Sequence, residues 1–358
     1  MLPKFLLGSP SIPKSIETVL PIRKPTWGLP SSDSDESAGQ PSDSQAKIKA
    51  TWLGHACFLV ELPVRIQASS PTPSRGARIL FDPVFSDRCS PSQHLGPKRY
   101  TKPPCQMEDI PDIDAIVISH NHYDHLDTTT IVNLSKRERP PHIFAPLGNA
   151  EYFRSIGIPG ARVHTLDWWE SRRVEVNLKA AAGTQNENNK TSDGASAILK
   201  FDVTCTPAQH FTGRGVLDRF KTLWASWVVE ESSPAKVFFG GDTAYRTVHD
   251  GEDENTVPTC PAFKEIGARF GGFDLALIPI GAYLPRDFMS SIHCAPQDSV
   301  RIFKDIGAKR GLGMHWGTWV LTTEDVLEPP RKLKEECKKI GIEDGAFGVC
   351  DIGETKFF

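Results

Sequence analysis

The sequence predicts an α/β fold in which helices cover β-sheets. Strands are indicated by short apolar and β-branched segments, several of which end in a histidine or an aspartate. Helices are indicated by three amphipathic segments, at residues 262–270, 295–306 and 330–340. Because the loops at strand ends often carry chemistry, the polar residues placed there are the candidates for a functional site.

The chain of 358 residues divides into an N-terminal arm and one catalytic domain. Residues 1–47 are rich in proline, serine and acidic residues, and the segment 31–37 is typical of a disordered linker. We assign residues 48–358 to the catalytic domain, because this length suits one large folded unit.

Several elements of the domain can be placed in order. Strands are expected at residues 49–62, 78–85 and 114–119, and Asp127 is suited to cap a following helix. Segments 173–180 and 197–205 are expected to form a hairpin joined by a mobile polar loop. An acidic excursion at 246–258 is either a lid or an insertion without function, and the second interpretation is favoured.

Composition limits the partners and the location of the protein. The formal net charge of −3 argues against nucleic acid as a partner, and eight cysteines without a CxxC pair indicate free thiols in a reducing compartment. No apolar run has the length of a membrane span or of a secretory signal. We therefore expect an intracellular protein, cytoplasmic or peripherally associated with an internal membrane, that is not secreted. Residues 5–7 with Lys4 fit either a membrane contact or a disordered tail.

The most informative stretch is His120-Asn121-His122-Tyr123-Asp124-His125, which holds three imidazoles and a carboxylate within six residues. It lies on a turn between the expected strand 114–119 and the expected helix. Neutral imidazole and carboxylate are common zinc ligands, and converging imidazoles are costly to bury without a metal. A solvated histidine-rich turn is the weaker alternative.

Further candidate ligands stand at the ends of other expected strands. Each would more often be an ordinary core or surface residue, but together with the six-residue turn they favour a metal site. Seven ligands exceed what one tetrahedral zinc uses, so two Zn²⁺ ions per chain are predicted. The expected division gives one metal to His120, His122 and His210 and the other to Asp124, His125 and His315, with Asp242 bridging the two.

Such a site supplies its own nucleophile, because a bound metal lowers the pKa of water to about 7. Two further polar residues are candidates for supporting roles. Asp82 is either a turn residue or a carboxylate that orients a ligand histidine, and the second is favoured. His55 is interpreted as a buried histidine bonding a loop rather than as a catalytic group.

The histidines and aspartates, in this order, resemble the metallo-β-lactamase superfamily. The resemblance implies a four-layer αβ/βα sandwich, with two mixed β-sheets packed face to face and flanked by helices. A narrower resemblance, to the N-acylphosphatidylethanolamine-hydrolysing phospholipase D family, runs from about Lys49 to the C-terminus. It is carried by residues 51–56, 82–86, 90–93, 96–99, 119–127, 166–170, 223–227, 240–243, 273–283 and 315–318, and residues 9–13 resemble the N-terminal arm of the family.

The narrower resemblance implies a zinc-dependent phospholipase D. Such an enzyme hydrolyses the phosphodiester of N-acylphosphatidylethanolamine to N-acylethanolamine and phosphatidic acid. The implied partners are a membrane phospholipid, a peripheral membrane surface and, from the family alone, a second copy of the chain in a homodimer. All seven ligand positions of the family are filled by matching residues.

The resemblance also places residues near the substrate. His293 falls where the family has a histidine beside the phosphate, and Gln93 and the next position line the substrate cavity. That next position is often tyrosine in the family and is His94 here, which changes the expected acyl pocket. Asp242 is the expected bridge, and Asp124 and His293 are alternative proton donors to the leaving group.

Two alternatives keep the fold and change the function. The first is a hydrolase of the same fold acting on a lactone or a soluble phosphodiester, and the family-specific segments outside the metal site argue against it. The second is a non-catalytic scaffold, which would be expected to lack at least one ligand, and none is missing.

Overall fold

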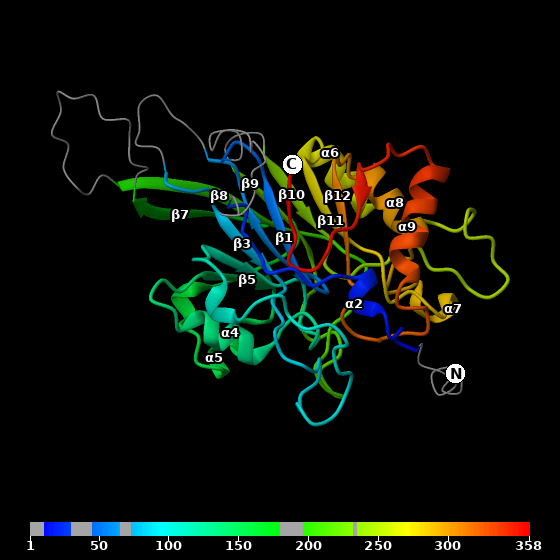
Figure 1. Cartoon of the computed structure of the whole chain (residues 1–358), viewed down its shortest axis with the longest axis horizontal. Helices are drawn as coiled ribbons and strands as arrows, with labels where there is room; N and C mark the ends of the chain where they lie inside the picture. Colours follow the sequence, from blue (N-terminus) through cyan, green and yellow to red (C-terminus); the bar gives the residue numbers. More distant parts are fainter. Residues whose placement is uncertain (1–10, 30–44, 65–72, 180–195, 232–234) are drawn as a thin grey trace.

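The computed structural model describes residues 11–29, 45–64, 73–179, 196–231 and 235–358. Within these ranges the strands form two mixed sheets of seven strands each. Figure 1 shows α4 (Thr128–Ser135) and α5 (Ala150–Ser155) at the lower left, and α6 (Ala262–Phe270), α8 (Pro296–Asp305) and α9 (Glu328–Lys339) at the right, outside the sheets. The predicted α/β sandwich of two mixed sheets flanked by helices is therefore confirmed.

The first sheet has the strand order β14-β1-β2-β3-β4-β5-β6. Its strands are β1 (Lys49–Gly54), β2 (Cys57–Glu61), β3 (Arg78–Phe81), β4 (Ala115–Val117), β5 (His142–Pro146), β6 (Val163–Leu166) and β14 (Thr355–Phe357). Pairing is antiparallel from β14 to β3 and parallel from β3 to β6. The expected strand at 49–62 is a hairpin, because Gly54 and His55 adopt positive φ and turn the chain.

The second sheet has the order β13-β12-β11-β10-β9-β8-β7. Its strands are β7 (Ser171–Lys179), β8 (Ser196–Thr206), β9 (Ser226–Glu231), β10 (Lys236–Phe239), β11 (Leu275–Pro279), β12 (Gly311–Met314) and β13 (Phe347–Gly348). It is antiparallel from β7 to β10 and parallel from β10 to β13. The expected hairpin is β7–β8, while its connecting loop lies outside the described residues, as do residues 5–7 and the linker at 31–37.

The helices cover the outer faces of the sheets. They are α2 (Ile16–Val19), α4 (Thr128–Ser135), α5 (Ala150–Ser155), α6 (Ala262–Phe270), α7 (Arg286–Met289), α8 (Pro296–Asp305) and α9 (Glu328–Lys339), with 3₁₀ turns at Met107–Asp109 and Gly160–Arg162. The three amphipathic segments correspond to α6, α8 and α9. Asp127 caps α4 as predicted, since its carboxylate accepts a hydrogen bond from the Thr129 N–H. No helix of the described ranges has the length and apolarity to cross a bilayer.

Alternation along the strands divides the apolar side chains between two cores. On β4, Ala115 and Val117 belong to the core that fills the sandwich, and Ile116 belongs with Ile131 of α4 to a second core. Burial on both faces explains why this strand is apolar throughout. A strand fixed on both faces gives the turn that follows it a rigid base.

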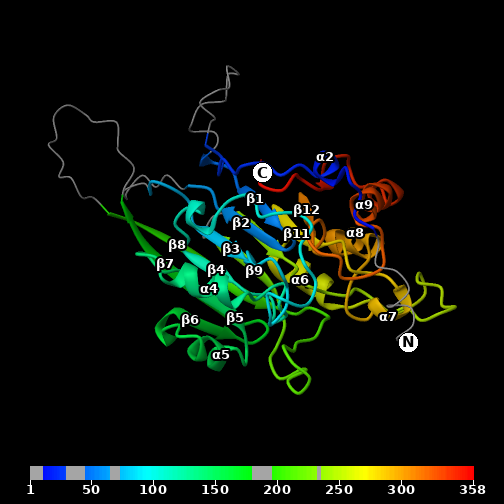
Figure 2. The same ribbon diagram turned by 60° about the horizontal axis from the view of Figure 1, so that its bottom comes forward.

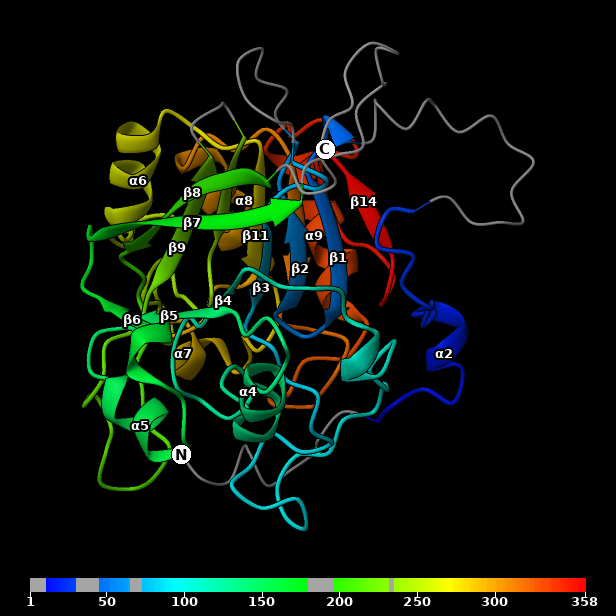
Figure 3. The same ribbon diagram turned by 90° about the vertical axis from the view of Figure 1, so that its left-hand side faces the viewer.

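The described part of the N-terminal arm lies against the domain. Ile16 and Leu20 are buried, and Ile22 forms a bridge with Ile352 near the C-terminus. Figures 2 and 3 show the blue arm running beside the red C-terminal segment. A division between the arm and the domain at residue 47 stays a prediction.

The acidic excursion at 246–258 is fastened by buried charges. The Arg246 guanidinium donates to Asp298 at 2.7 Å, and Arg286 lies 2.6 Å from the other oxygen of Asp298 and 3.2 Å from Glu254. Asp298 also accepts from the Ala295 N–H at the start of α8. These pairs join the excursion to α7 and α8.

We expect Asp298→Asn to lower the free energy of unfolding by about 3 kcal/mol, because it removes the buried carboxylate that pairs with both arginines and leaves them only the partly exposed Glu254. Urea unfolding followed by circular dichroism measures this change. Asp202→Asn is the matched control, since Asp202 pairs with Arg173 at the surface, and its effect should be much smaller. Equal effects of the two substitutions would contradict the assignment.

Candidate metal centre

All seven predicted ligands converge at one end of the sandwich. The turn after β4 supplies His120, His122, Asp124 and His125. The other three come from the second sheet, and His210, Asp242 and His315 follow β8, β10 and β12 respectively. Side chains more than a hundred residues apart in the sequence thus face one another across the two sheets.

The first group contains three imidazoles. His122 Nδ1 lies 2.8 Å from His120 Nε2 and 3.3 Å from His210 Nε2. The three ring nitrogens all lie within 4.8 Å of one another. Three convergent nitrogens are a common donor set for a transition metal.

The second group lies beside the first. Asp124 Oδ2 is 3.6 Å from His125 Nε2 and 3.5 Å from His315 Nε2. Its other neighbour is His55, whose Nε2 lies 3.1 Å from the same oxygen. Asp124, His125, His315 and His55 all lie within 4.8 Å of one another through their donor atoms.

Asp242 stands between the two groups. Its Oδ2 is 3.7 Å from the Nε2 atoms of both His120 and His210, and 3.2 Å from His125 Nε2. Its Oδ1 is 3.1 Å from His315 Nε2. The two groups and the shared carboxylate match the division that the sequence predicts, and their role as ligands stays a prediction.

The outer nitrogens of three histidines are held by fixed partners. Ser119 Oγ lies 2.9 Å from His120 Nδ1, and the carbonyl of Ile292 lies 2.7 Å from His210 Nδ1. Asp82 Oδ2 lies 2.6 Å from His125 Nδ1, as expected of an orienting carboxylate. With Nδ1 engaged, the Nε2 atoms point to the centre.

Strained backbone brings these residues together. His55, Asp82 and His315 all have positive φ, between 37° and 63°, which is unusual for residues other than glycine. Gly241, with φ of 55°, precedes Asp242, and a Cβ there would lie 2.4 Å from the Cβ of Ser119. Only glycine therefore allows the loop after β10 to approach the turn after β4 this closely.

Charges within the centre follow from burial and from the two carboxylates. Burial holds the pKa of His120 and His210 well below the usual value, so these rings are neutral. Burial alone would raise the pKa of Asp242, but His125 and His315 lower it well below the usual range. Burial alone would lower the pKa of His315, but Asp242 raises it to about 9. The carboxylates are thus ionised and require a nearby positive charge.

The donor set fits divalent metal ions. His125 Nε2, His315 Nε2 and Asp242 Oδ1 are buried and in ion-pair contact, but none of them makes a hydrogen bond of good geometry within the described part of the chain. Buried polar atoms without partners are costly, and a cation at the centre would satisfy all three. His120 and His210 are already in the neutral form that binds such ions, whereas His125 and His315, whose pKa values the carboxylates raise, bind an ion by losing their protons.

Two histidines outside the seven also belong to the cluster. His293 Nε2 is 3.6 Å from Asp242 Oδ2, and its ring lies 5.0 Å from the rings of both His210 and His315. His55 occupies a turn, and its carbonyl accepts hydrogen bonds from the His315 N–H and the Trp52 indole. The sequence marks His55 only by its place after Gly54, which is too weak a signal to find its contact with Asp124.

Gln93 and His94 lie on an exposed loop. The Gln93 side chain is engaged within that loop, since its amide donates to the Arg88 carbonyl and its oxygen accepts from the Arg88 N–H, both at 3.0 Å. The substrate-binding role of both residues stays a prediction.

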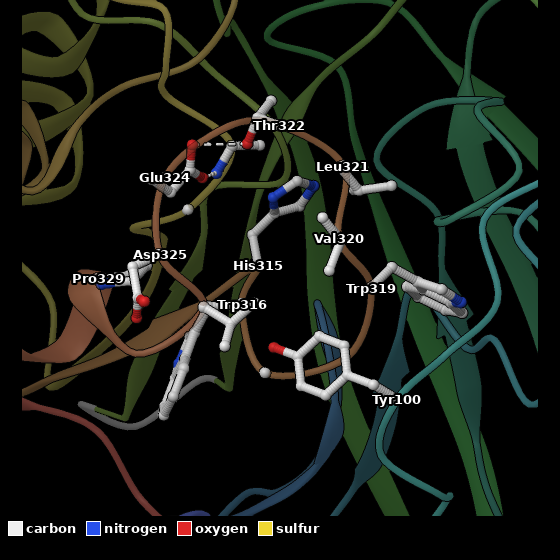
Figure 4. A pocket seen from close by; sticks show the side chains of 14 residues that line it. Tyr100, His315, Trp316, Trp319, Val320, Leu321, Thr322, Glu324, Asp325 and Pro329 are labelled. Carbon is white, nitrogen blue, oxygen red and sulfur yellow. Dashed lines mark hydrogen bonds between the residues drawn. The ribbon is translucent and has the colours of Figure 1, made fainter. Parts of the chain in front are cut away.

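A small cavity lies behind His315. Figure 4 shows Tyr100, Trp316 and Trp319 around it, with Thr322 donating to Glu324 at its rim. Its volume is about 30 Å³. That space holds roughly two water molecules, so it is far too small for an acyl chain.

Comparison with known proteins places the chain among hydrolases. Residues 77–316 match the family described as a beta-lactamase superfamily domain. The chain is 36% identical over 316 residues to N-acyl-phosphatidylethanolamine-hydrolyzing phospholipase D 1 of Caenorhabditis elegans, covering 87% of this chain and 76% of that protein. It is 33% identical over 372 residues to the mitochondrial N-acyl-phosphatidylethanolamine-hydrolyzing phospholipase D of Saccharomyces cerevisiae, covering 98% and 69%.

The fold is shared with solved structures of low sequence identity. A possible metal-dependent hydrolase from Veillonella parvula superposes with a TM-score of 0.57 at 17% identity, covering 87% of this chain and 99% of that one. At this identity the likeness concerns the fold alone.

We expect Asp82→Asn to weaken zinc affinity roughly 10- to 100-fold, because an amide cannot replace the charged acceptor that orients His125. Titration of the metal-free protein with zinc against a chromophoric chelator measures the affinity. Asp202→Asn, a surface change of the same chemistry, should leave it unaltered. Wild-type affinity in Asp82→Asn would show that the contact does not support the centre.

Proposed function

Because the chain belongs to the N-acylphosphatidylethanolamine-hydrolysing phospholipase D family of the metallo-β-lactamase superfamily, we propose that it hydrolyses N-acylphosphatidylethanolamine to N-acylethanolamine and phosphatidic acid. The fold and the relatives make it a metal-dependent hydrolase. The observation that carries the finer proposal is the pair of ligand groups around Asp242, set in a chain that matches both phospholipases over most of its length.

Two Zn²⁺ ions are part of the proposal. His120, His122 and His210 would hold one, Asp124, His125 and His315 would hold the other, and Asp242 would be shared. When bound, such ions polarise a phosphoryl oxygen and make hydroxide available at neutral pH.

The residues of this chain then position the substrate and its protons. The bond that breaks joins phosphorus to the ethanolamide oxygen, and the departing alkoxide needs a proton. The Asp124 carboxyl is not suited to supply it: burial would raise its pKa, but His125 lowers it well below the usual range and keeps the group ionised. His293 is the other candidate, since it lies beside Asp242 and its Nδ1 lacks a partner among the described residues. Burial lowers the pKa of His293 to about 4, so it can donate a proton only if the negative charge of the bound phosphate raises that pKa.

The proposed substrate implies that the protein binds to a membrane surface. N-acylphosphatidylethanolamine resides in a bilayer, so the protein would work as a peripheral membrane enzyme. The yeast relative carries mitochondrial in its name, which supports an internal membrane as the location. A homodimer, and the lack of a nucleic-acid partner, stay predictions.

The direct test measures N-acylethanolamine release from N-acylphosphatidylethanolamine in detergent micelles, together with the zinc content of the same preparation. We expect two zinc ions per chain, product release, and loss of release on chelation. Asp242→Asn should lower the rate at least about 100-fold, because both groups lose their shared carboxylate. Asp202→Asn should retain the wild-type rate.

A second assay separates the proposal from its alternative. If the zinc-loaded protein releases nothing from the lipid but cleaves a soluble phosphodiester such as bis(p-nitrophenyl) phosphate, the metal centre stands and the lipid substrate is wrong. If the zinc-loaded protein turns over neither substrate, both the proposed lipid reaction and the alternative reaction on a soluble phosphodiester are wrong.

A further inference from the structure

The loop of residues 213–221 exposes apolar side chains to solvent beside the metal centre. Val216 is 97% exposed and Leu217 is 86% exposed at its tip, and Phe220 is 57% exposed. A single exposed apolar residue needs no explanation, but Val216 and Leu217 at the loop tip, with Phe220 alongside, form an exposed apolar patch.

Internal hydrogen bonds of the loop keep this apolar patch directed outward. Thr212 Oγ1 donates to the Thr222 carbonyl at 2.7 Å, and the Phe220 N–H donates to the Thr212 carbonyl at 3.0 Å, which closes the base of the loop. The Asp218 carboxylate accepts from the N–H groups of Arg214 and Gly215 at 2.9 and 2.7 Å. The loop is therefore ordered without folding its apolar tip back onto the domain.

The loop is fastened to the turn that carries the candidate ligands. The Arg214 guanidinium donates to the carbonyls of Asn121 and Leu126 at 2.9 and 2.8 Å, and it lies 3.9 Å from the ring centre of Tyr123. The Gly213 N–H donates to Asn121 Oδ1 at 2.9 Å. The position of the tip is thus fixed relative to the metal centre.

Positive charge surrounds the tip although the whole chain carries −3. Arg219 and Lys221 are exposed, and the Arg219 guanidinium lies over the rings of Phe211 and Phe220. The only acidic residue of the loop, Asp218, turns its carboxylate to the backbone. Apolar residues flanked by cations suit the boundary between phosphate headgroups and acyl chains.

A second loop, residues 88–98, begins and ends beside the segment that follows His315. It carries Leu95, which is 74% exposed, and Lys98. Its ends are held near the segment after His315, since the Trp319 indole donates to the Asp87 carbonyl and the Tyr100 N–H donates to the Thr318 carbonyl. In Figures 1 and 3 both loops extend from the lower end of the molecule.

We propose that the 213–221 loop is the membrane-docking element of this protein, with Val216 and Leu217 entering the acyl region of a bilayer and Arg219 and Lys221 binding lipid phosphates. Leu95 on the second loop is its counterpart across the centre. This inference rests on the proposed function, because a membrane-lipid substrate is what makes a bilayer the expected occupant. It locates the membrane contact at the mouth of the centre rather than in the N-terminal arm.

Vesicle binding without turnover tests the proposal. The zinc-loaded full-length protein is sedimented with vesicles of phosphatidylcholine alone, and of phosphatidylcholine with phosphatidylglycerol, neither containing N-acylphosphatidylethanolamine. The double variant Val216→Ser with Leu217→Ser should lower the partition coefficient roughly 10- to 100-fold on both vesicles, because two side chains lose their transfer from water. The double variant Arg219→Glu with Lys221→Glu should weaken binding mainly to the anionic vesicles, and this loss should shrink at high salt.

The matched control removes two exposed apolar side chains elsewhere. Val19→Ser with Ile198→Ser, on α2 and β8, should bind vesicles like the wild type. Thermal unfolding and zinc content exclude misfolding of each variant. Absence of wild-type binding, or equal binding by the Val216 and Leu217 variant, would overturn the proposal. Vesicle binding without lipid hydrolysis in micelles would instead leave the docking loop in place and reject the proposed reaction.

Discussion

A buried carboxylate among imidazoles is the constraint on which the rest of the structure depends. Asp242 lies within 3.7 Å of His120, His125, His210 and His315. An ionised carboxylate in the interior is tolerated only when positive charge faces it. Here that charge comes from protons on the surrounding imidazoles or from metal ions that these imidazoles bind. The stability of the centre and its chemistry therefore both depend on the balance between the buried carboxylate and the positive charge around it.

The scaffold holds this balance through contacts that reach beyond the ligands. Ser119 and Asp82 fix two of the imidazoles, and the Ile292 carbonyl fixes a third. Positive φ at Asp82 and His315 carries a cost that the packed strands before them offset. Orientation by such partners keeps the ligand atoms convergent, and this is the arrangement that metal-dependent hydrolysis requires.

Local patterns in the sequence predict much of this arrangement. The apolar run before His120 and the carboxylate of Asp127 predict a strand, a turn and a capped helix, all of which the structure contains. What the sequence cannot give is the pairing of strands distant in the chain, because that depends on packing across two sheets. The contact of His55 with Asp124, and the outward direction of Val216, arise only from that packing.

The origin of the ligands in both sheets has a consequence for biosynthesis. The turn after β4 emerges from the ribosome with four of the seven candidate ligands, whereas His315 emerges 190 residues after His125, the last of those four. A nascent chain that stops before β12 exposes a charged, histidine-rich turn without its partners. The centre can therefore be completed only after β12 has been made, so metal binding reports that ligands from both sheets have come together.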